Sequence, residues 1–174
     1  QIQDQCGKSL VTHLIQQDFF HAAKHIGAYC AFDGEIPLHT LLFGEAMTDK
    51  TLLLPKILSE SEKSMAFYPT ISDQDLETNN WGIKEPQDQQ DAQTSLDLIL
   101  VPLVAYGPNG TRLGMGAGFY DRALKAMLKK QKNPPVLVGC VYSFQHSLSI
   151  KTFEHDIHMD YIASEAGISR AAKD

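Results

Sequence analysis

The sequence predicts an α/β fold, a three-layer sandwich with a mostly parallel sheet and helices on both faces. Three observations support this prediction. Short apolar runs that are typical of buried strands alternate with helical segments along the chain, as they do in parallel sheets. One of these runs, "LDLILVPLVAY", precedes a glycine-rich loop. A helical segment with basic residues near its end follows that loop, and this order is typical of α/β proteins that bind an anion.

The first half of the chain is expected to contain one long helix and three strands. The helix is expected from Cys6 to Phe20. A buried strand, "HIGAYCAF", is expected from His25 to Phe32, followed by a turn at Asp33–Gly34 and a helix that begins near Pro37. Two further short strands are expected, "TLLLP" over 51–55 and "SMAFYP" over 64–69.

The second half is expected to complete a single domain. The polar segment 72–94 contains one apolar island, "NNWGIKEP", and is expected to be mostly loop. A strand over 96–106, the glycine loop and the helix "FYDRALKAMLKK" come next, followed by strands over 136–143 and 161–164. No repeat or low-complexity tract divides the 174 residues, so we predict one domain.

The composition is that of a globular protein, with 43% hydrophobic and 21% charged residues. The formal net charge of −6 argues against a surface that binds nucleic acid or anionic membranes in general. No apolar stretch is long enough to span a bilayer, and no signal-peptide pattern occurs from Gln1 onward. The three cysteines lie far apart and form no C-x-x-C motif, which favours a reducing compartment. We therefore expect a cytoplasmic protein.

The glycine-rich loop "TRLGMGAGFYDR", from Thr111 to Arg122, has glycines at the alternate positions 114, 116 and 118. Glycine leaves backbone N–H groups accessible where a side chain would obstruct a ligand such as a phosphate. The loop lacks the Gly-Lys-Ser/Thr of a P-loop, and Phe119 stands where the dinucleotide fingerprint requires a glycine. It is similar to the loop of Rossmann-type methyltransferases, but Arg112 occupies the region where these enzymes usually carry an acidic residue. A tight turn that packs a helix against a strand is the alternative without a ligand.

The segments around this loop resemble the 5-formyltetrahydrofolate cyclo-ligase family, also called methenyltetrahydrofolate synthetases. "VPLVAYGPNGTRLGMGAGFYDRAL" is similar to the family's V-P-G run and R-L-G-x-G-G-G-Y-Y-D-R motif. Further segments of this chain between Ala28 and Glu165 also resemble the family and occur in the family's order. They are "AFDGEIPLHTLL", "LLLPKI", "WGIKEP" and "HDIHMDYIASE". The departures are Leu103 for the glycine of V-P-G, Met115 and Ala117 within the loop, and Phe119 for its first tyrosine.

The resemblance implies a ligase that uses ATP to convert 5-formyltetrahydrofolate to 5,10-methenyltetrahydrofolate, with release of ADP and phosphate. In this chemistry ATP phosphorylates the formyl oxygen, N10 of the folate attacks the activated carbon, and phosphate leaves. Such an enzyme aligns two ligands and neutralises phosphate charge, so no residue is assigned a covalent catalytic role. The implied cofactors are ATP as co-substrate and Mg²⁺. We expect no partner besides these small molecules, neither nucleic acid nor membrane, and a monomeric protein.

The residues that the resemblance places along the ATP phosphates are Arg112, Leu113, Gly114, Met115, Gly116, Ala117, Gly118, Phe119 and Tyr120. Arg112 is expected to bind phosphate directly, although taken alone it is equally a surface arginine after a turn. Asp121 and Asp156 fall on the family's Mg²⁺-binding positions, and carboxylate oxygens suit this cation. Without the resemblance, Asp121 is an acidic residue in the first turn of a helix and Asp156 a solvated loop acid.

The folate contacts implied by the resemblance are Cys30, Glu35 and Trp81, together with Met115, Gly116, Ala117, Gly118 and Phe119. The Glu35 carboxylate can accept hydrogen bonds from the aminopteridine edge, or it can be an acidic residue at a helix start. Cys30 is expected to be an inert buried thiol that contacts the substrate by packing. Trp81 can stack on a ring of the folate or anchor the long loop that contains it.

The front of the chain departs most from the family. Family members usually begin with a helix rich in Lys and Arg that reaches the ATP phosphates, whereas in "QIQDQCGKSL" only Lys8 is basic. We therefore expect residues 1–174 to form a single cyclo-ligase domain that lacks a basic N-terminal segment. The alternative of a different class is a non-enzymatic module that binds a folate or another metabolite. Retention of both Arg112 and Asp121 favours ATP chemistry, because folate binding alone requires no metal site.

Overall fold

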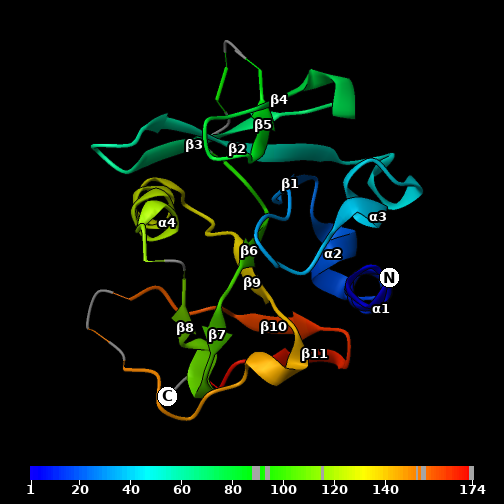
Figure 1. Ribbon diagram of the computed structural model, residues 1–174, viewed down its shortest axis with the longest axis vertical. Helices are drawn as coiled ribbons and strands as arrows, with labels where there is room; N and C mark the ends of the chain where they lie inside the picture. The colour runs from blue at the N-terminus through cyan, green and yellow to red at the C-terminus, as the bar shows by residue number, and fades with distance from the viewer. Residues whose placement is uncertain (88–90, 93–94, 115, 152, 154–155, 173–174) are drawn as a thin grey trace.

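A twisted central sheet organises the molecule (Figure 1). The computed structural model describes residues 1–87, 91–92, 95–114, 116–151, 153 and 156–172. Within them, seven strands form this sheet in the order β11-β10-β9-β6-β1-β2-β3. The five inner strands are parallel to their neighbours, and the edge strands β11 and β3 are antiparallel. The strands are β1 (His25–Gly27), β2 (Thr51–Ser59), β3 (Ser64–Pro69), β6 (Leu98–Pro102), β9 (Val136–Cys140), β10 (Tyr161–Ser164) and β11 (Gly167–Arg170).

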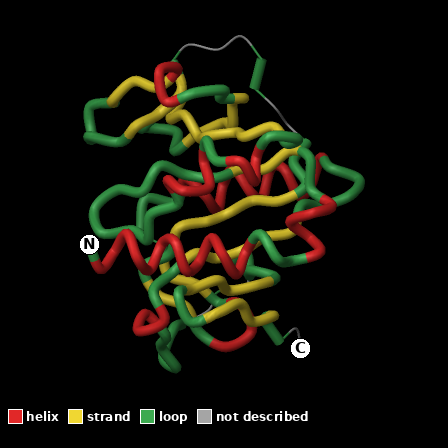
Figure 2. Tube along the Cα trace, turned by 90° about the vertical axis from the view of Figure 1, so that its right-hand side faces the viewer, coloured by secondary structure: helices red, strands yellow, loops and turns green. Residues whose placement is uncertain are grey.

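Helices cover both faces of the sheet. They are α1 (Ile2–Leu14), α2 (Asp18–Ala22), α3 (His39–Leu42) and α4 (Phe119–Lys130), with short 3₁₀ turns η1 (Glu45–Met47), η2 (Asp73–Asp75), η3 (Pro108–Gly110) and η4 (Ser143–Gln145). Side chains of β6 alternate between two cores, because Leu98 and Leu100 pack with α1 to α3 whereas Ile99 and Val101 pack with α4. Figure 2 shows α1 running across one face of the sheet, and α4 lies on the opposite face in Figure 1. The predicted three-layer sandwich is confirmed.

Five of the predicted elements have different boundaries. The strand expected over 51–55 continues to Ser59, and the strand expected over 136–143 ends at Cys140. The helix expected over 6–20 is two helices, because the Gln17 side-chain amide donates to the carbonyl of His13, 3.1 Å away, and ends α1. The strand expected over 25–32 pairs only as far as Gly27, and the Tyr29 hydroxyl then donates to the carbonyl of Ile36 at 2.7 Å, which holds the following loop back against the sheet. The strand expected over 96–106 spans only Leu98–Pro102.

Small sheets lie outside the main one. After Pro102 the chain turns away, and β7 (Ala105–Tyr106) pairs with β8 (Arg112–Leu113), which carries the chain into the glycine loop. The segment 72–94, expected to be mostly loop, contains an antiparallel hairpin of β4 (Leu76–Thr78) and β5 (Lys84–Pro86). The carboxylate of the buried residue Glu85 accepts a hydrogen bond from the Asn79 side chain at 2.9 Å and so ties this hairpin together.

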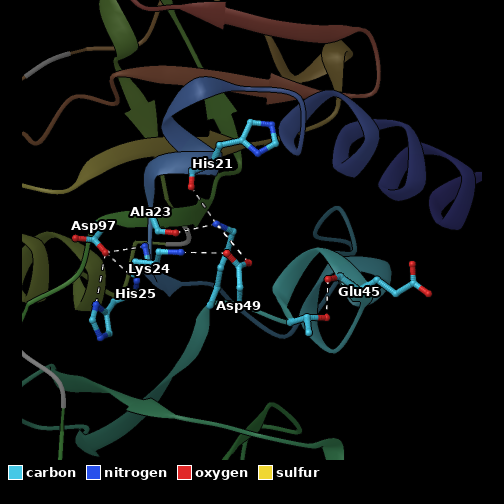
Figure 3. A network of polar contacts seen from close by, with 9 residues as sticks. His21, Ala23, Lys24, His25, Glu45, Asp49 and Asp97 are labelled. Atoms are coloured by element: carbon cyan, nitrogen blue, oxygen red, sulfur yellow. Dashed lines mark hydrogen bonds and ion pairs between the residues drawn. The ribbon is translucent and has the colours of Figure 1, made fainter.

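A polar network fixes the amino ends of the parallel strands (Figure 3). Asp97, directly before β6, accepts the backbone N–H groups of Lys24 and His25 at 2.8 Å each. Partial burial opposes its ionisation, but these amides and the adjacent His25 ring hold the pKa of Asp97 below its usual range. The Lys50 ammonium donates to the carbonyl of Ala23 at 2.8 Å. Because this edge is filled by structural contacts, the opposite edge, where the parallel strands end, is the place for a ligand site.

None of the described helices has the length and apolar character needed to cross a membrane.

Candidate active site

The glycine loop joins β8 to α4 and has an open outer face. Gly116 and Gly118 adopt φ values of 81° and 78°, which only glycine adopts readily. A Cβ built on either residue has no atom within 4 Å, so close packing of helix on strand does not account for these glycines. Gly118 is the N-cap of the twelve-residue helix α4, and no side chain caps the amides of its first turn. Such a helix start favours an anion. Met115 lies outside the described residues.

Arg112 joins three parts of the site. Its guanidinium pairs with the Asp121 carboxylate in the first turn of α4. Its Nε donates to the carbonyl of Ile157 at 3.3 Å, which brings the segment that contains Asp156 to the same side chain. The Arg112 side chain is only 6% exposed, whereas that of Asp121 is 47% exposed. A largely buried arginine with two partners is a positioned group rather than a free surface arginine.

The two aspartates that the sequence singled out for Mg²⁺ are held differently. Asp121 pairs with Arg112, and Asp156 accepts the N–H of Phe153 at 2.8 Å. Among the described residues, no group of three or more His, Cys, Asp and Glu side chains is arranged to hold a metal on its own. Mg²⁺ commonly takes one or two carboxylates and completes its coordination with water and substrate phosphates. A carboxylate has about four acceptor sites, so Asp121 can accept a second partner beside Arg112. The residues present fit a magnesium ion that arrives with a nucleotide.

A pocket of about 390 Å³ opens beyond the carboxyl end of β1. This volume suits a small ligand. Its walls come from the segment after β1, the first turn of α1, the start of α3, and Asp73 and Lys84 at the rim. The wall is rigid because α1 packs on it without a gap: a Cβ on Gly7 would lie 2.3 Å from the carbonyl oxygen of Pro37. Cys30 and Glu35 both line this pocket, as do Phe32 and His39, which belong to the motif "AFDGEIPLHTLL" but were not assigned a contact from the sequence.

Glu35 is the most perturbed carboxyl of this pocket. Its Oε2 accepts the N–H of Phe32 at 3.0 Å. Burial raises the pKa of Glu35 to about 7, the nearby Asp33 adds to this effect, and the Phe32 hydrogen bond opposes it. Burial raises the pKa values of Tyr29 and Tyr120, and the negative charge of the Glu35 carboxylate raises them further. Tyr120 belongs to the first turn of α4, so the Glu35 side of the pocket lies near the helix that follows the glycine loop.

Cys30 lines the same pocket as a protonated thiol. Burial raises its pKa to about 11, with a smaller opposing effect of Lys84. A thiol with such a pKa is a poor nucleophile at neutral pH. This agrees with a packing role for Cys30.

Trp81 lies beside the glycine loop rather than in this pocket. Its ring meets that of Phe119 edge to face, with the ring centroids 6.2 Å apart. Its indole N–H donates to Glu60 Oε1 at 2.9 Å. It lines a second pocket of about 210 Å³ between the β2–β3 and β4–β5 hairpins. Trp81 therefore connects the β4–β5 hairpin to the start of α4.

Comparison with known proteins decides the family. A model of the 5-formyltetrahydrofolate cyclo-ligase family matches residues 1–165. The chain belongs to the 5-formyltetrahydrofolate cyclo-ligase family. It is 33% identical over 158 residues to the 5-formyltetrahydrofolate cyclo-ligase of Haemophilus influenzae, covering 89% of this chain and 83% of that protein. The Escherichia coli K12 enzyme of the same name is 27% identical over 169 residues, 95% of this chain and 91% of that protein.

Solved structures of cyclo-ligase relatives share the fold. The 5,10-methenyltetrahydrofolate synthetase of Aquifex aeolicus superposes with a TM-score of 0.78 at 30% identity, covering 97% of this chain and 82% of that one. The synthetase of Mycoplasma pneumoniae, at 19% identity, gives a TM-score of 0.70 over 94% and 87% of the two chains and shows the fold alone. The family confirms the predicted class of enzyme, a ligase that uses ATP to cyclise 5-formyltetrahydrofolate. It gives no support to a methyltransferase or a non-enzymatic module.

Proposed function

We propose that the 390 Å³ pocket holds the folate and that the glycine loop holds the ATP phosphates, so that ring closure takes place where the two meet. One observation carries this assignment. Burial is the main cause of the raised pKa of Tyr120 at the start of α4, and the carboxylate of the pocket residue Glu35 adds to it, so the two sites lie near one another. The formyl oxygen must reach the γ-phosphate of ATP during the reaction, and this requires two neighbouring sites.

The residues of the loop suit the phosphates. The amides at the start of α4 have no side-chain cap, and there is open space where a Cβ would stand on Gly116 or Gly118, so these amides can donate to phosphate oxygens. Arg112 is held in place by Asp121 and by the carbonyl of Ile157, and its positive charge can stabilise the charge that develops on the transferred group. The formyl oxygen attacks the γ-phosphorus, and ADP leaves. N10 then attacks the activated carbon, and phosphate departs.

Mg²⁺ belongs to the same proposal. Asp121 and Asp156 are the residues that we assign to it, with the phosphates of ATP as its further ligands. The ion would neutralise phosphate charge and orient the γ-phosphate. Trp81 packs on Phe119 at the start of α4, so we assign its folate contact to a position next to the glycine loop.

Turnover tests the proposal directly. The chain is incubated with 5-formyltetrahydrofolate, ATP and Mg²⁺, and the absorbance of the methenyl product is followed together with ADP release. We expect methenyl product and ADP to form in equal amounts, and neither to form when ATP or the folate is left out. Absence of the methenyl signal with all three components present contradicts the proposal.

A further inference from the structure

Ring closure releases a proton, and the residues assigned so far do not accept it. The N10 nitrogen carries one hydrogen before it attacks the formyl-derived carbon, and it carries none in the methenyl product. Arg112, the loop amides and the two aspartates are occupied by phosphate and metal in the proposed function. A group of the folate pocket within reach of the reacting atoms can take this proton before the phosphate leaves.

We propose that Glu35 is the general base that removes the proton from N10 during ring closure. This inference rests on the proposed function and adds a role for one residue in it. In the step, the N10 lone pair forms the new bond to the activated carbon while the N10–H electron pair remains on nitrogen and the proton passes to the Glu35 carboxylate. The carbon–oxygen bond then breaks, phosphate leaves with its electron pair, and the proton on Glu35 passes to that phosphate. Atoms and charges balance without a further reactant.

The contacts of Glu35 leave one of its oxygens available for a substrate. Oε2 accepts the N–H of Phe32 at 3.0 Å, and this bond fixes the direction of the carboxyl group. No described residue donates a hydrogen bond to Oε1. The side chain is partly buried and lines the pocket, so Oε1 can meet a bound folate with little competition from solvent.

The position of Glu35 favours the reacting end of the folate over its aminopyrimidine edge. Burial is the main cause of the raised pKa of Tyr120, and the Glu35 carboxyl lies near enough to add to it; Tyr120 follows the phosphate loop. The formyl group must approach that loop, and N10 is the nitrogen that attacks it. A pKa raised to about 7 also suits a base at neutral pH better than it suits a carboxylate that must stay ionised to bind an amino group.

Other titratable groups surround this carboxyl. Tyr29 and Cys30 follow β1, Asp33 lies in the same loop, Tyr120 comes from α4, and Cys140 ends β9; Asp4, His39, Asp73 and Lys84 stand around the pocket. Burial raises the pKa of Cys30 to about 11 and that of Cys140 to about 12, so neither thiol ionises near neutrality. His39 also lines the pocket, and a His39→Gln variant tests whether this histidine, rather than Glu35, causes the pH dependence.

Single-turnover kinetics test the role of Glu35. The enzyme is mixed with both substrates and Mg²⁺, and ADP and methenyl product are measured in the same samples across a range of pH. In the wild type, the rate of methenyl formation should rise as the pH increases through about 7, because the carboxylate is the active form. In Glu35→Gln, ADP should form at close to the wild-type rate, methenyl formation should fall by about 10²–10⁴-fold, and the rise with pH should disappear. Glu35→Asp should recover part of the rate, and His39→Gln should keep the rise.

Distinct results overturn the inference. Methenyl formation by Glu35→Gln at the wild-type rate and with the same pH rise excludes a role as base. A parallel loss of ADP and methenyl product, restored by saturating folate, assigns Glu35 to binding alone. Loss of the pH rise in His39→Gln with Glu35 intact transfers the role to the histidine. If the folded wild type forms neither product, the proposed function fails and this inference fails with it. Thermal unfolding of each variant shows that it is folded.

Discussion

A Gly116→Val protein is expected to fold but to lose ATP binding. Gly116 has a φ of 81°, and a β-branched residue in this left-handed region costs about 1–2 kcal/mol of stability. No atom lies within 4 Å of a Cβ at this position, so the new side chain starts in the open space on the loop. If the phosphates bind there, affinity for ATP should fall by about 100-fold or more, ~3 kcal/mol. Isothermal titration with ATP and Mg²⁺ measures this loss.

Gly167→Val is the matched control for this variant. Gly167 also has a positive φ, 141°, and also has no atom within 4 Å of a Cβ, but it lies at the start of the edge strand β11. We expect a similar loss of stability and normal affinity for ATP. Normal ATP affinity in a folded Gly116→Val protein would mean that the loop is only a turn and does not bind ATP.

An Asp121→Asn protein is expected to lose turnover while it stays folded. An amide is a weak ligand for a hard cation, and the charge stabilisation that a catalytic metal supplies is worth several kcal/mol. We expect kcat to fall by about 100-fold or more, with partial recovery at high Mg²⁺. The variant also removes the charge that pairs with Arg112, so about 1 kcal/mol of stability should be lost. Initial rates across a Mg²⁺ titration, together with thermal unfolding, measure both effects.

Two further variants complete this experiment. Asp156→Asn should give the same loss of turnover, and the double variant should be little worse than either single one, because both residues serve one ion. Asp18→Asn is the matched control, since Asp18 is an exposed acidic residue in the first turn of α2, away from the loop. It should cost at most about 0.3–1 kcal/mol and leave turnover unchanged. Wild-type rates for Asp121→Asn at limiting Mg²⁺ would remove this residue from the metal site.

Local signals in the sequence located the parts of the fold that local interactions determine. The segment "FYDRALKAMLKK" forms α4 over Phe119–Lys130, and "SMAFYP" forms β3 over Ser64–Pro69, because helical periodicity and β-propensity act within each segment. The β4–β5 hairpin was missed because it depends on the buried carboxylate of Glu85 and its partner Asn79, which no alternating pattern announces. The edge strand β11 was missed for a similar reason, since it is short and half exposed and gains its order from pairing with β10.

The sequence offered candidate site residues one by one but not their arrangement. Cys30, Glu35 and Arg112 were proposed from sequence motifs, yet nothing in their order shows that Glu35 lies near Tyr120 or that Arg112 pairs with Asp121. The first contact joins the loop after β1 to the start of α4, whereas the second closes the glycine loop between β8 and α4. The raised pKa of Glu35 follows from the same packing, because burial is its main cause.

The path of one oxygen atom tests the central claim most directly. The chain is supplied with 5-formyltetrahydrofolate that carries a heavy oxygen isotope in its formyl group, with unlabelled ATP and Mg²⁺, and the phosphate released in a single turnover is analysed by mass. A pocket and a phosphate loop that act together transfer the formyl oxygen to the γ-phosphate, so the released phosphate should carry the label in a one-to-one ratio with the methenyl product. Methenyl product formed alongside unlabelled phosphate would contradict the account.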